Sequence, residues 1–239
     1  MNDLKMYRVT GWFGLAVVVL ALGQFPLYMV GDPSISVYDG AASAQEMFRI
    51  QNVVLTRILL NMGLYVAMMV FAAGFRHLIR RANPDYEWIG TLVFGAAVVW
   101  LAVTLVANGL EGGTVLDTLG GNADPSVVRA LIEGYLLIYN GSIAFAITGL
   151  FLGAAGYATF ATGVLPRWTG WVAYVGTALC VISVPAMYGG PVDVTGFYNA
   201  GGWGPIIIAN FPPAIWFVVA SVSLIRTREV TAPTPDSVG

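Results

Sequence analysis

The sequence predicts an all-α polytopic integral membrane protein, a bundle of six transmembrane helices, and two observations lead to this prediction. Hydrophobic residues make up 57% of the 239 residues and charged residues only 10%, whereas roughly a quarter of the residues of a soluble domain are charged. The apolar residues also fall into six long blocks, and each block supplies the ~20 residues with which a helix crosses a bilayer.

The expected spans follow one another along a single domain, residues 1–226. The first covers about residues 11–30, and its apolar run exceeds the ~7–15 residues of a signal-peptide core, so we expect it to remain uncleaved. The others lie at about 53–75, 88–108, within 131–160, 168–187 and 205–225. Residues 227–239 are mostly polar and include two prolines, which predicts a disordered tail.

Glycine and proline mark where these helices pack and bend. Gly149 and Gly153 form a GxxxG pair in the fourth block, a spacing typical of closely packed membrane helices. Pro212-Pro213 cannot donate backbone hydrogen bonds, so we expect the sixth helix to bend near Asn210, and Pro185 to bend the fifth.

Charge predicts how the bundle sits in the cell membrane. Basic residues concentrate in one set of helix flanks and loops: Lys5, Arg8, Arg76, Arg80, Arg81, Arg167, Arg226 and Arg228. The opposite set holds only Arg49, Arg129 and, near its edge, Arg57. The positive-inside rule then predicts that both termini, and with them the tail, are cytoplasmic.

Several classes of function are excluded by composition. The net charge is −2, and no basic face is available for nucleic acid. A single cysteine, Cys180, rules out an internal disulfide, and a single histidine, His77, rules out a multi-histidine metal or haem site. We therefore expect no metal and no cofactor, and membrane lipids as the chief surroundings.

Polar residues inside apolar spans are candidate functional residues, because burying them in hydrocarbon is costly. Arg57 and Asn61 share one helix face, and Arg129 and Glu133 have the same four-residue spacing. One interpretation pairs Arg57 with Glu133 in an outward-facing pocket. The other places Arg57 at the interface, reaching water, and Glu133 in an exposed pair with Arg129.

Two sets of candidate site residues result. The candidate binding residues are polar side chains expected at similar depth: Arg57, Asn61, Arg129, Tyr139, Asn140, Tyr188 and Asn210. The candidate catalytic residues are carboxyls, with Glu133 as the general acid and Glu111 or Asp193 beside it.

Three functions are compatible with this pattern. The first is binding or passage of a small lipophilic molecule through an outward-facing polar mouth. The second is a membrane-embedded enzyme, similar to a terpene cyclase or a lipid-modifying enzyme, in which Glu133 donates the proton. The third is a structural or accessory subunit without chemistry of its own.

One segment carries a family resemblance. Residues 163–170, with Pro166, Arg167 and Gly170, resemble the "G-x-L-P-R-x-x-G" turn of a bacterial membrane family, domain-of-unknown-function family 4386. The similarity extends over roughly residues 1–191 and includes Tyr7-Arg8-Val9-Thr10-Gly11 near the start. It implies a multi-helix membrane fold and brings no activity or catalytic residue with it.

Overall fold

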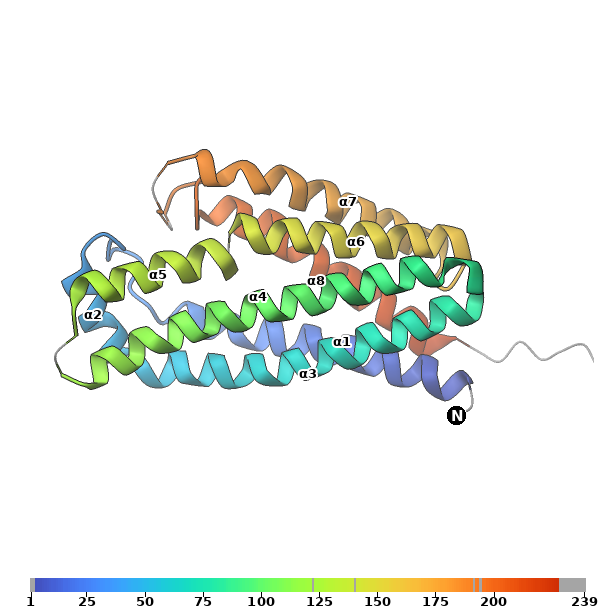
Figure 1. Cartoon of the computed structure of the whole chain (residues 1–239), viewed down its shortest axis with the longest axis horizontal. Helices are drawn as coiled ribbons and strands as arrows, with labels where there is room; N and C mark the ends of the chain where they lie inside the picture. Colours follow the sequence, from blue (N-terminus) through green and yellow to red (C-terminus); the bar gives the residue numbers. More distant parts are fainter. Residues whose placement is uncertain (1–2, 122, 140, 191, 194, 228–239) are drawn as a thin grey trace, which may run out of the picture.

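The computed structural model describes residues 3–121, 123–139, 141–190, 192–193 and 195–227 (Figure 1). It is 84% helical, and the described residues contain no strand. Six helical segments are long and apolar enough to cross a membrane, which confirms the predicted fold class. The expected disordered tail, from residue 228 onward, lies outside the described residues.

The spans and the shorter helices between them follow in chain order. They are α1 (Asp3–Tyr28), α2 (Gly40–Arg49), α3 (Gln51–Ala82), η1 (Pro84–Tyr86), α4 (Glu87–Leu119), α5 (Pro125–Tyr139), α6 (Ser142–Thr162), α7 (Arg167–Ser183), η2 (Val184–Tyr188) and α8 (Trp203–Arg226). α2 lies in the first long connection, and η1 and η2 are short 3-10 helices that adjoin α4 and α7.

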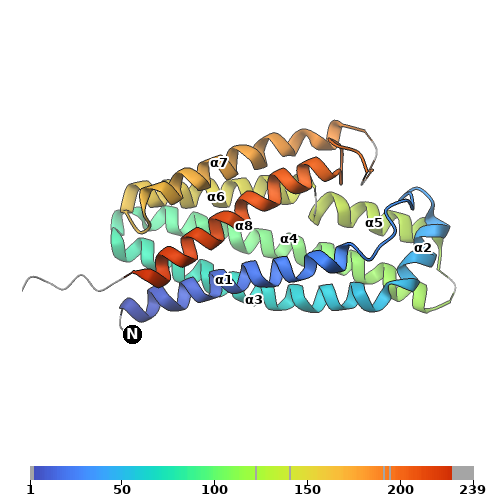
Figure 2. The same ribbon diagram turned by 180° about the vertical axis from the view of Figure 1, so that it is seen from behind.

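The spanning helices form a closed ring. Contacts link α3 to α1, α1 to α8, α8 to α7, α7 to α6, α6 to α4 and α4 back to α3. Figures 1 and 2 show this bundle from its two sides, with the start of α1 and the end of α8 at the same end. The short α5 and α2 lie at the other end, and α5 packs on α4 and α2.

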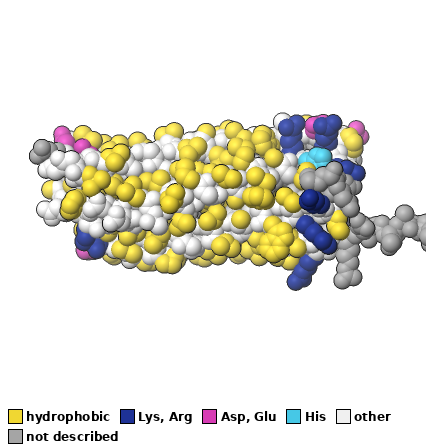
Figure 3. Space-filling view, turned by 90° about the horizontal axis from the view of Figure 1, so that it is seen from below, with side chains coloured by type: hydrophobic (Ala, Val, Ile, Leu, Met, Phe, Trp, Pro, Cys, Tyr) yellow, Lys and Arg dark blue, Asp and Glu magenta, His cyan; other side chains and the backbone are white. Residues whose placement is uncertain are grey.

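The two ends differ in charge. Figure 3 shows lysine and arginine side chains gathered at the end that holds both termini, while apolar side chains cover most of the visible middle. We call this the basic end, defined by Lys5, Arg8, Arg76, Arg80, Arg81, Arg167 and Arg226. The opposite end, with residues 29–39, α2 and the described part of 189–202, is the loop end. Which end faces the cytoplasm stays a prediction.

α4 is much longer than the predicted span 88–108. It continues to Leu119. Glu111, which the expected span left in the following loop, therefore lies on the helix. Glu111, Thr114, Val115 and Thr118 are buried along this extension, and α2 and α5 pack against α4 there. Protein contacts at the loop end therefore extend the helix beyond the length that hydrocarbon alone requires.

The fourth apolar block, predicted as one span, is two helices. α5 ends at Tyr139 and α6 begins at Ser142, with Gly141 before it. A Cβ atom at Gly141 would lie 2.3 Å from the carbonyl oxygen of Leu137, so the break requires glycine. Ser142 Oγ donates to the carbonyl of Val184 and fastens the start of α6 to η2.

The predicted glycine contacts are present in the structure. A Cβ atom built at Gly149 would lie 3.3 Å from the Cβ of Cys180 on α7, and one built at Gly153 would lie 3.5 Å from the side chain of Thr177 on the same helix. Small residues on α6 thus bring α6 and α7 together, as the GxxxG spacing predicts.

The prolines of α8 are accommodated without ending the helix. α8 continues through Pro212 and Pro213, and Pro213 leaves the carbonyl of Ala209 without its usual backbone donor. The Cys180 thiol donates to that carbonyl at 3.6 Å. Pro185 lies in η2, where α7 has given way to a 3-10 turn, so the fifth span changes its helix type there.

Aromatic rings fill the basic half of the ring of helices. Phe71 and Phe75 stack on α3, and the buried Trp216 packs edge-on against both of them and against Phe151 of α6. Phe217 packs against the same cluster. Such edge-to-face and offset arrangements are the favoured geometries of aromatic pairs, and this part of the bundle is a packed core.

Candidate functional site

The loop-end half of the bundle encloses a cavity of about 650 Å³. Its walls come from α1, the 29–39 segment, α2, α3, α4, α5 and α8. Most of the lining is apolar, for example Phe25, Ile132, Leu136 and Phe211. The volume falls within the about 300–1,000 Å³ of typical small-molecule sites.

A buried ion pair forms one side of this cavity. Arg57 Nη2 of α3 donates to Glu111 Oε1 of α4, and the two side chains are only 8% and 4% exposed. Both residues line the cavity. The predicted pairing of Arg57 with Glu133 is therefore wrong, and so is the alternative in which Arg57 reaches water. The extension of α4 beyond residue 108 brings Glu111 to Arg57 instead.

Several polar atoms around this pair have no hydrogen-bond partner. They are Arg57 Nε, Glu111 Oε2 and the hydroxyls of Tyr28 and Tyr135. Tyr28 lies beneath the Arg57 guanidinium, 4.2 Å from its ring centroid, in cation–π geometry. The Tyr135 hydroxyl lies close to Glu111 and to the Tyr28 hydroxyl, but these contacts fall short of good hydrogen-bond geometry. Buried polar atoms are normally satisfied, so these can receive a ligand.

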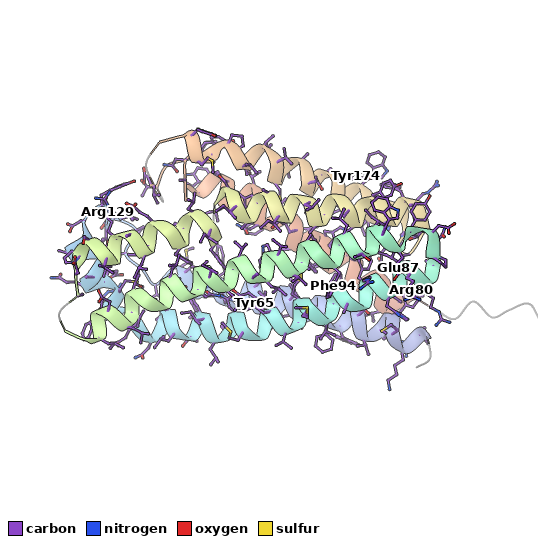
Figure 4. The ribbon with its side chains drawn as sticks, in the orientation of Figure 1. Tyr65, Arg80, Glu87, Phe94, Arg129 and Tyr174 are labelled. Atoms are coloured by element: carbon purple, nitrogen blue, oxygen red, sulfur yellow. The ribbon has the colours of Figure 1, made fainter. Side chains whose placement is uncertain are left out.

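A separate chain of hydrogen bonds lies next to the ion pair, toward the middle of the bundle. Tyr139 of α5 donates to Asn61 Oδ1 at 3.2 Å, and Asn61 Nδ2 donates to Asn108 Oδ1 at 3.1 Å. Asn108 in turn donates to the hydroxyl of Tyr65, which Figure 4 labels midway along α3. Arg57, Asn61 and Tyr65 are spaced by four residues, so one face of α3 carries the whole polar stripe.

The segment 29–39 and α2 cover the cavity at the loop end. Glu46 accepts from the backbone N–H of Asp32 at 2.9 Å and from Arg49 Nε at 2.7 Å. Arg49 also donates to the carbonyl of Val30 at 3.1 Å. The hydrogen bonds from Arg49 hold the pKa of the Glu46 carboxyl below its ordinary value. A charged Glu46 therefore ties the covering segment to α2.

A second set of contacts joins this cover to the rest of the loop end. The backbone N–H of Val192 donates to the Tyr38 hydroxyl at 2.9 Å. The Arg129 guanidinium of α5 lies over the Tyr38 ring, 4.5 Å from its centroid. At Gly40 a Cβ would lie 2.2 Å from the carbonyl oxygen of Pro125, so the start of α2 lies directly on the start of α5.

Other predicted site residues lie outside the cavity. Glu133 accepts from Arg129 Nε at 2.8 Å, and both side chains are substantially exposed, at 35% and 44%. Figure 4 shows Arg129 at the loop end, beside α5. Glu133 is thus paired at the surface, because it lies on a face of α5 that does not line the cavity. The interpretation of Arg129 and Glu133 as an exposed pair is the one that the structure supports.

The remaining predicted residues are placed as follows. Tyr188 is 86% exposed, and Asp193 accepts from Thr195 in a local turn, which lowers the pKa of its carboxyl. Asn210 lines the cavity and donates to the carbonyl of Ile206 at 2.8 Å. Asn140 lies outside the described residues. The structure thus brings together Arg57, Asn61, Tyr139, Asn210 and Glu111 around the cavity and the chain of hydrogen bonds behind it.

Sequence reasoning gave little or no role to several residues of this site. Tyr28 and Gln24 lie at the end of an apolar span, where aromatic and amide side chains commonly mark an interface. Glu46 belongs to a long connection between two spans, and this connection lacks the long apolar run that indicates a membrane helix. The four-residue spacing of Tyr135 and Tyr139 repeats that of Arg57 and Asn61, and this was the one available signal for a facing polar stripe.

The residues described show no group of three or more histidine, cysteine, aspartate or glutamate side chains that could hold a metal ion. The charged side chains that line the cavity are the Arg57–Glu111 pair, Glu46, which is paired with Arg49, and Asp32 at the loop end. Hydroxyls and amides supply the rest of its polar wall. Such a wall can orient the polar group of a ligand and leave the apolar lining to hold the rest.

Comparisons with known proteins add no relative. No family model matches this chain, and neither a curated protein nor a solved structure matches it. The resemblance to domain-of-unknown-function family 4386 stays a prediction.

Proposed function

We propose that this protein binds, or lets pass, a small lipophilic molecule in the cavity at its loop end, as a multi-pass protein of the cell membrane. One observation carries the proposal. An apolar cavity of about 650 Å³ has unpartnered polar atoms of Arg57, Glu111, Tyr28 and Tyr135 in its wall. An unsatisfied buried polar group costs about 1–3 kcal/mol, and a ligand that completes its hydrogen bonds recovers part of that cost.

We propose further that the basic end is cytoplasmic, so the cavity lies in the outer half of the membrane. The excess of arginine and lysine at the basic end supports this orientation. Tags fused to the two ends should both be protected from proteases added outside intact cells. Digestion of either tag would contradict the orientation.

The binding proposal is tested with the protein extracted together with its surrounding lipid. Mass spectrometry should find a lipophilic molecule enriched over the bulk lipid in wild-type samples. Tyr135→Phe should lower its affinity by about five- to tenfold, since a hydrogen bond to the ligand is worth about 1 kcal/mol. Because the Tyr135 hydroxyl makes no well-formed hydrogen bond within the described protein and only lies close to Glu111 and Tyr28, the same change should have little effect on thermal stability.

The matched control is Tyr157→Phe. Tyr157 is a tyrosine of α6 that packs against Tyr86 and Trp88 and does not line the cavity. This variant should retain the ligand at wild-type affinity. Equal affinity in the Tyr135→Phe variant, or wild-type samples without an enriched lipophile, would contradict the proposal.

A membrane-embedded enzyme acting on an isoprenoid or other lipid is the second candidate. The observation that favours it is Glu111, a carboxylate in an apolar cavity with one oxygen unpartnered beside two tyrosines. Glu111, rather than Glu133, is then the group in contact with substrate. Glu111→Gln should abolish conversion of an added lipid substrate, and Glu133→Gln should not. A bound lipophile that wild-type protein always returns chemically unchanged would exclude this candidate.

A further inference from the structure

We infer that the cavity opens sideways between α1 and α8, and that it takes up from the hydrocarbon of the bilayer a lipophile with a single neutral, hydrogen-bonding head such as a hydroxyl. This inference rests on the proposed binding function and adds to it a route and a chemical class of ligand. It depends on the shape of the α1–α8 contact, on the depth of the opening and on the charge of the cavity wall.

The mouth of the cavity is formed by apolar side chains that are both cavity-lining and exposed. On α1 these are Leu22 and Phe25, which are 51% and 49% exposed, and on α8 they are Ile207 and Phe211, at 47% and 44%. The rings of Phe25 and Phe211 meet edge to face, with centroids 6.3 Å apart. Two aromatic side chains therefore stand between the cavity and the surroundings of the bundle.

The two helices are packed closely at the basic end and are open at the loop end. A Cβ at Gly11 would lie 2.7 Å from the carbonyl oxygen of Ser221, and one at Gly14 would lie 2.1 Å from Ser221 Oγ. Toward the loop end, the cavity-lining side chains Phe25 and Phe211 lie between the two helices instead. Figure 2 shows α8 running away from α1 toward the loop end, with α4 and α5 visible behind.

The opening lies at the depth of the hydrocarbon. Phe25 follows Arg8 by seventeen residues and Phe211 precedes Arg226 by fifteen, which places them about 26 Å and about 23 Å from these basic residues at ~1.5 Å per residue. The hydrocarbon layer is ~30 Å thick. Neither α1 from residue 11 to 28 nor α8 from residue 203 to 225 contains a charged residue, so lipid chains rather than water surround the mouth.

The side of the cavity toward the loop end is covered. The 29–39 segment is held by Glu46, Arg49 and the hydrogen bond between Tyr38 and Val192. A molecule dissolved in the membrane meets the apolar side chains of the mouth, which form no hydrogen bonds across it, whereas one dissolved in water meets this hydrogen-bonded cover. The lateral route is therefore the less obstructed one.

The cavity wall favours a neutral head. The charges of Arg57 and Glu111 cancel each other, and Arg49 compensates the charge of Glu46 at the loop end. An ionic ligand would therefore add an uncompensated charge to an apolar space, which is costly. The unpartnered atoms include donors, namely Arg57 Nε and the two tyrosine hydroxyls, and acceptors, namely Glu111 Oε2 and Gln24 Oε1. A hydroxyl donates and accepts at once, and it matches this mixed wall better than a carboxylate or an ammonium group does.

The head group is tested in lipid nanodiscs with photoactivatable probes that share one long alkyl chain. A long-chain alcohol should label cavity peptides of α1, α4 or α5 at least about tenfold more than the corresponding carboxylate or trimethylammonium compound, a difference of about 1.4 kcal/mol. Equal or stronger labelling by a charged probe would overturn the neutral head. Absence of cavity labelling by any of the probes would overturn the binding function itself.

The route is tested by bridging the mouth. Phe25→Cys with Phe211→Cys allows a reversible bis-methanethiosulfonate bridge between α1 and α8, and the native Cys180 is buried. The bridge should slow labelling by the alcohol about tenfold, and a reductant should restore it. The control, Phe160→Cys with Trp171→Cys, bridges another edge-to-face pair, whose centroids are 5.3 Å apart, and should leave labelling unchanged.

A second variant tests the route without relying on a complete bridge between the helices. Phe25→Ala with Phe211→Ala removes both rings and should speed labelling by the alcohol. Cavity labelling whose rate responds neither to the bridge nor to removal of the rings would overturn the lateral route while leaving the binding function intact.

Discussion

The buried pair of Arg57 and Glu111 allows a quantitative prediction. The side chains are 8% and 4% exposed, so replacing either one leaves the other charge buried without its partner. Breaking a buried pair in this way costs about 3–5 kcal/mol, whereas replacing both partners by apolar residues is often nearly neutral. We expect Arg57→Met and Glu111→Leu each to lower the free energy of unfolding by about 3–5 kcal/mol, and the double variant by no more than about 1 kcal/mol.

The chain provides a matched control for this cycle. Arg129 and Glu133 also form an arginine–glutamate pair, but their side chains are 44% and 35% exposed. Exposed pairs of this spacing contribute about 0.5 kcal/mol or less, so Glu133→Leu should change stability by no more than that. Arg129→Met also removes the contact with the Tyr38 ring and should cost no more than about 1.5 kcal/mol. The burial of the remaining charge, rather than the loss of an ion pair as such, then accounts for the difference in stability.

The assay is reversible unfolding in mixed micelles with increasing sodium dodecyl sulfate, followed by the fluorescence of the seven tryptophans, of which Trp216 is fully buried. Free energies of the four variants in each cycle give the coupling energy of each pair. The reasoning would be refuted if Arg57→Met cost no more than Arg129→Met, or if the double variant at residues 57 and 111 were as unstable as the sum of its single variants.

Three further predictions concern other parts of the fold. The hydrogen bonds from Arg49 lower the pKa of Glu46, so the stabilisation that charged Glu46 provides is complete above the ordinary glutamate pKa and is lost as the pH falls through the lowered pKa. Backbone amide exchange in residues 29–39 should therefore rise on acidification. The Glu46→Gln variant should lack this pH dependence. Gly14→Ala should destabilise the protein by about 1–3 kcal/mol by overpacking, whereas Gly95→Ala, whose Cβ meets nothing within 4 Å, should stabilise it by about 0.5–1 kcal/mol; thermal unfolding of the two variants compares them, and similar melting temperatures would contradict the packing argument. The buried Cys180 should react with a water-soluble maleimide only after unfolding, and rapid labelling of the native protein would show that α7 and α8 separate there.

The sequence predicted the fold well because the fold class depends on composition and segment length. A bilayer-spanning helix needs a long apolar run whatever its neighbours are. Gly149 and Gly153 were likewise predictable as packing residues, because their spacing alone places them on one helix face. The end of α4 was not predictable, since buried contacts with α2 and α5, rather than hydrocarbon, keep residues 109–119 helical.

The candidate site was predicted only in part. The shared face of Arg57 and Asn61 follows from spacing within one helix, and the structure adds Tyr65 to it. The partner of Arg57 could not be deduced in the same way. Glu133 and Glu111 were both carboxyls near the same end of the bundle, and the choice between them depends on how α4 and α5 are rotated about their axes.

Local sequence is sufficient to specify six lipid-compatible helices with arginine and lysine concentrated at one end. The apolar length and the charge of each segment depend only on the residues of that segment. The pairing of Arg57 with Glu111, the surface position of Glu133 and the parting of α1 from α8 around a cavity arise only when the helices pack. Those outcomes depend on contacts between residues far apart in the chain, such as the close approach of Gly11 and Gly14 to Ser221, and no local pattern records them.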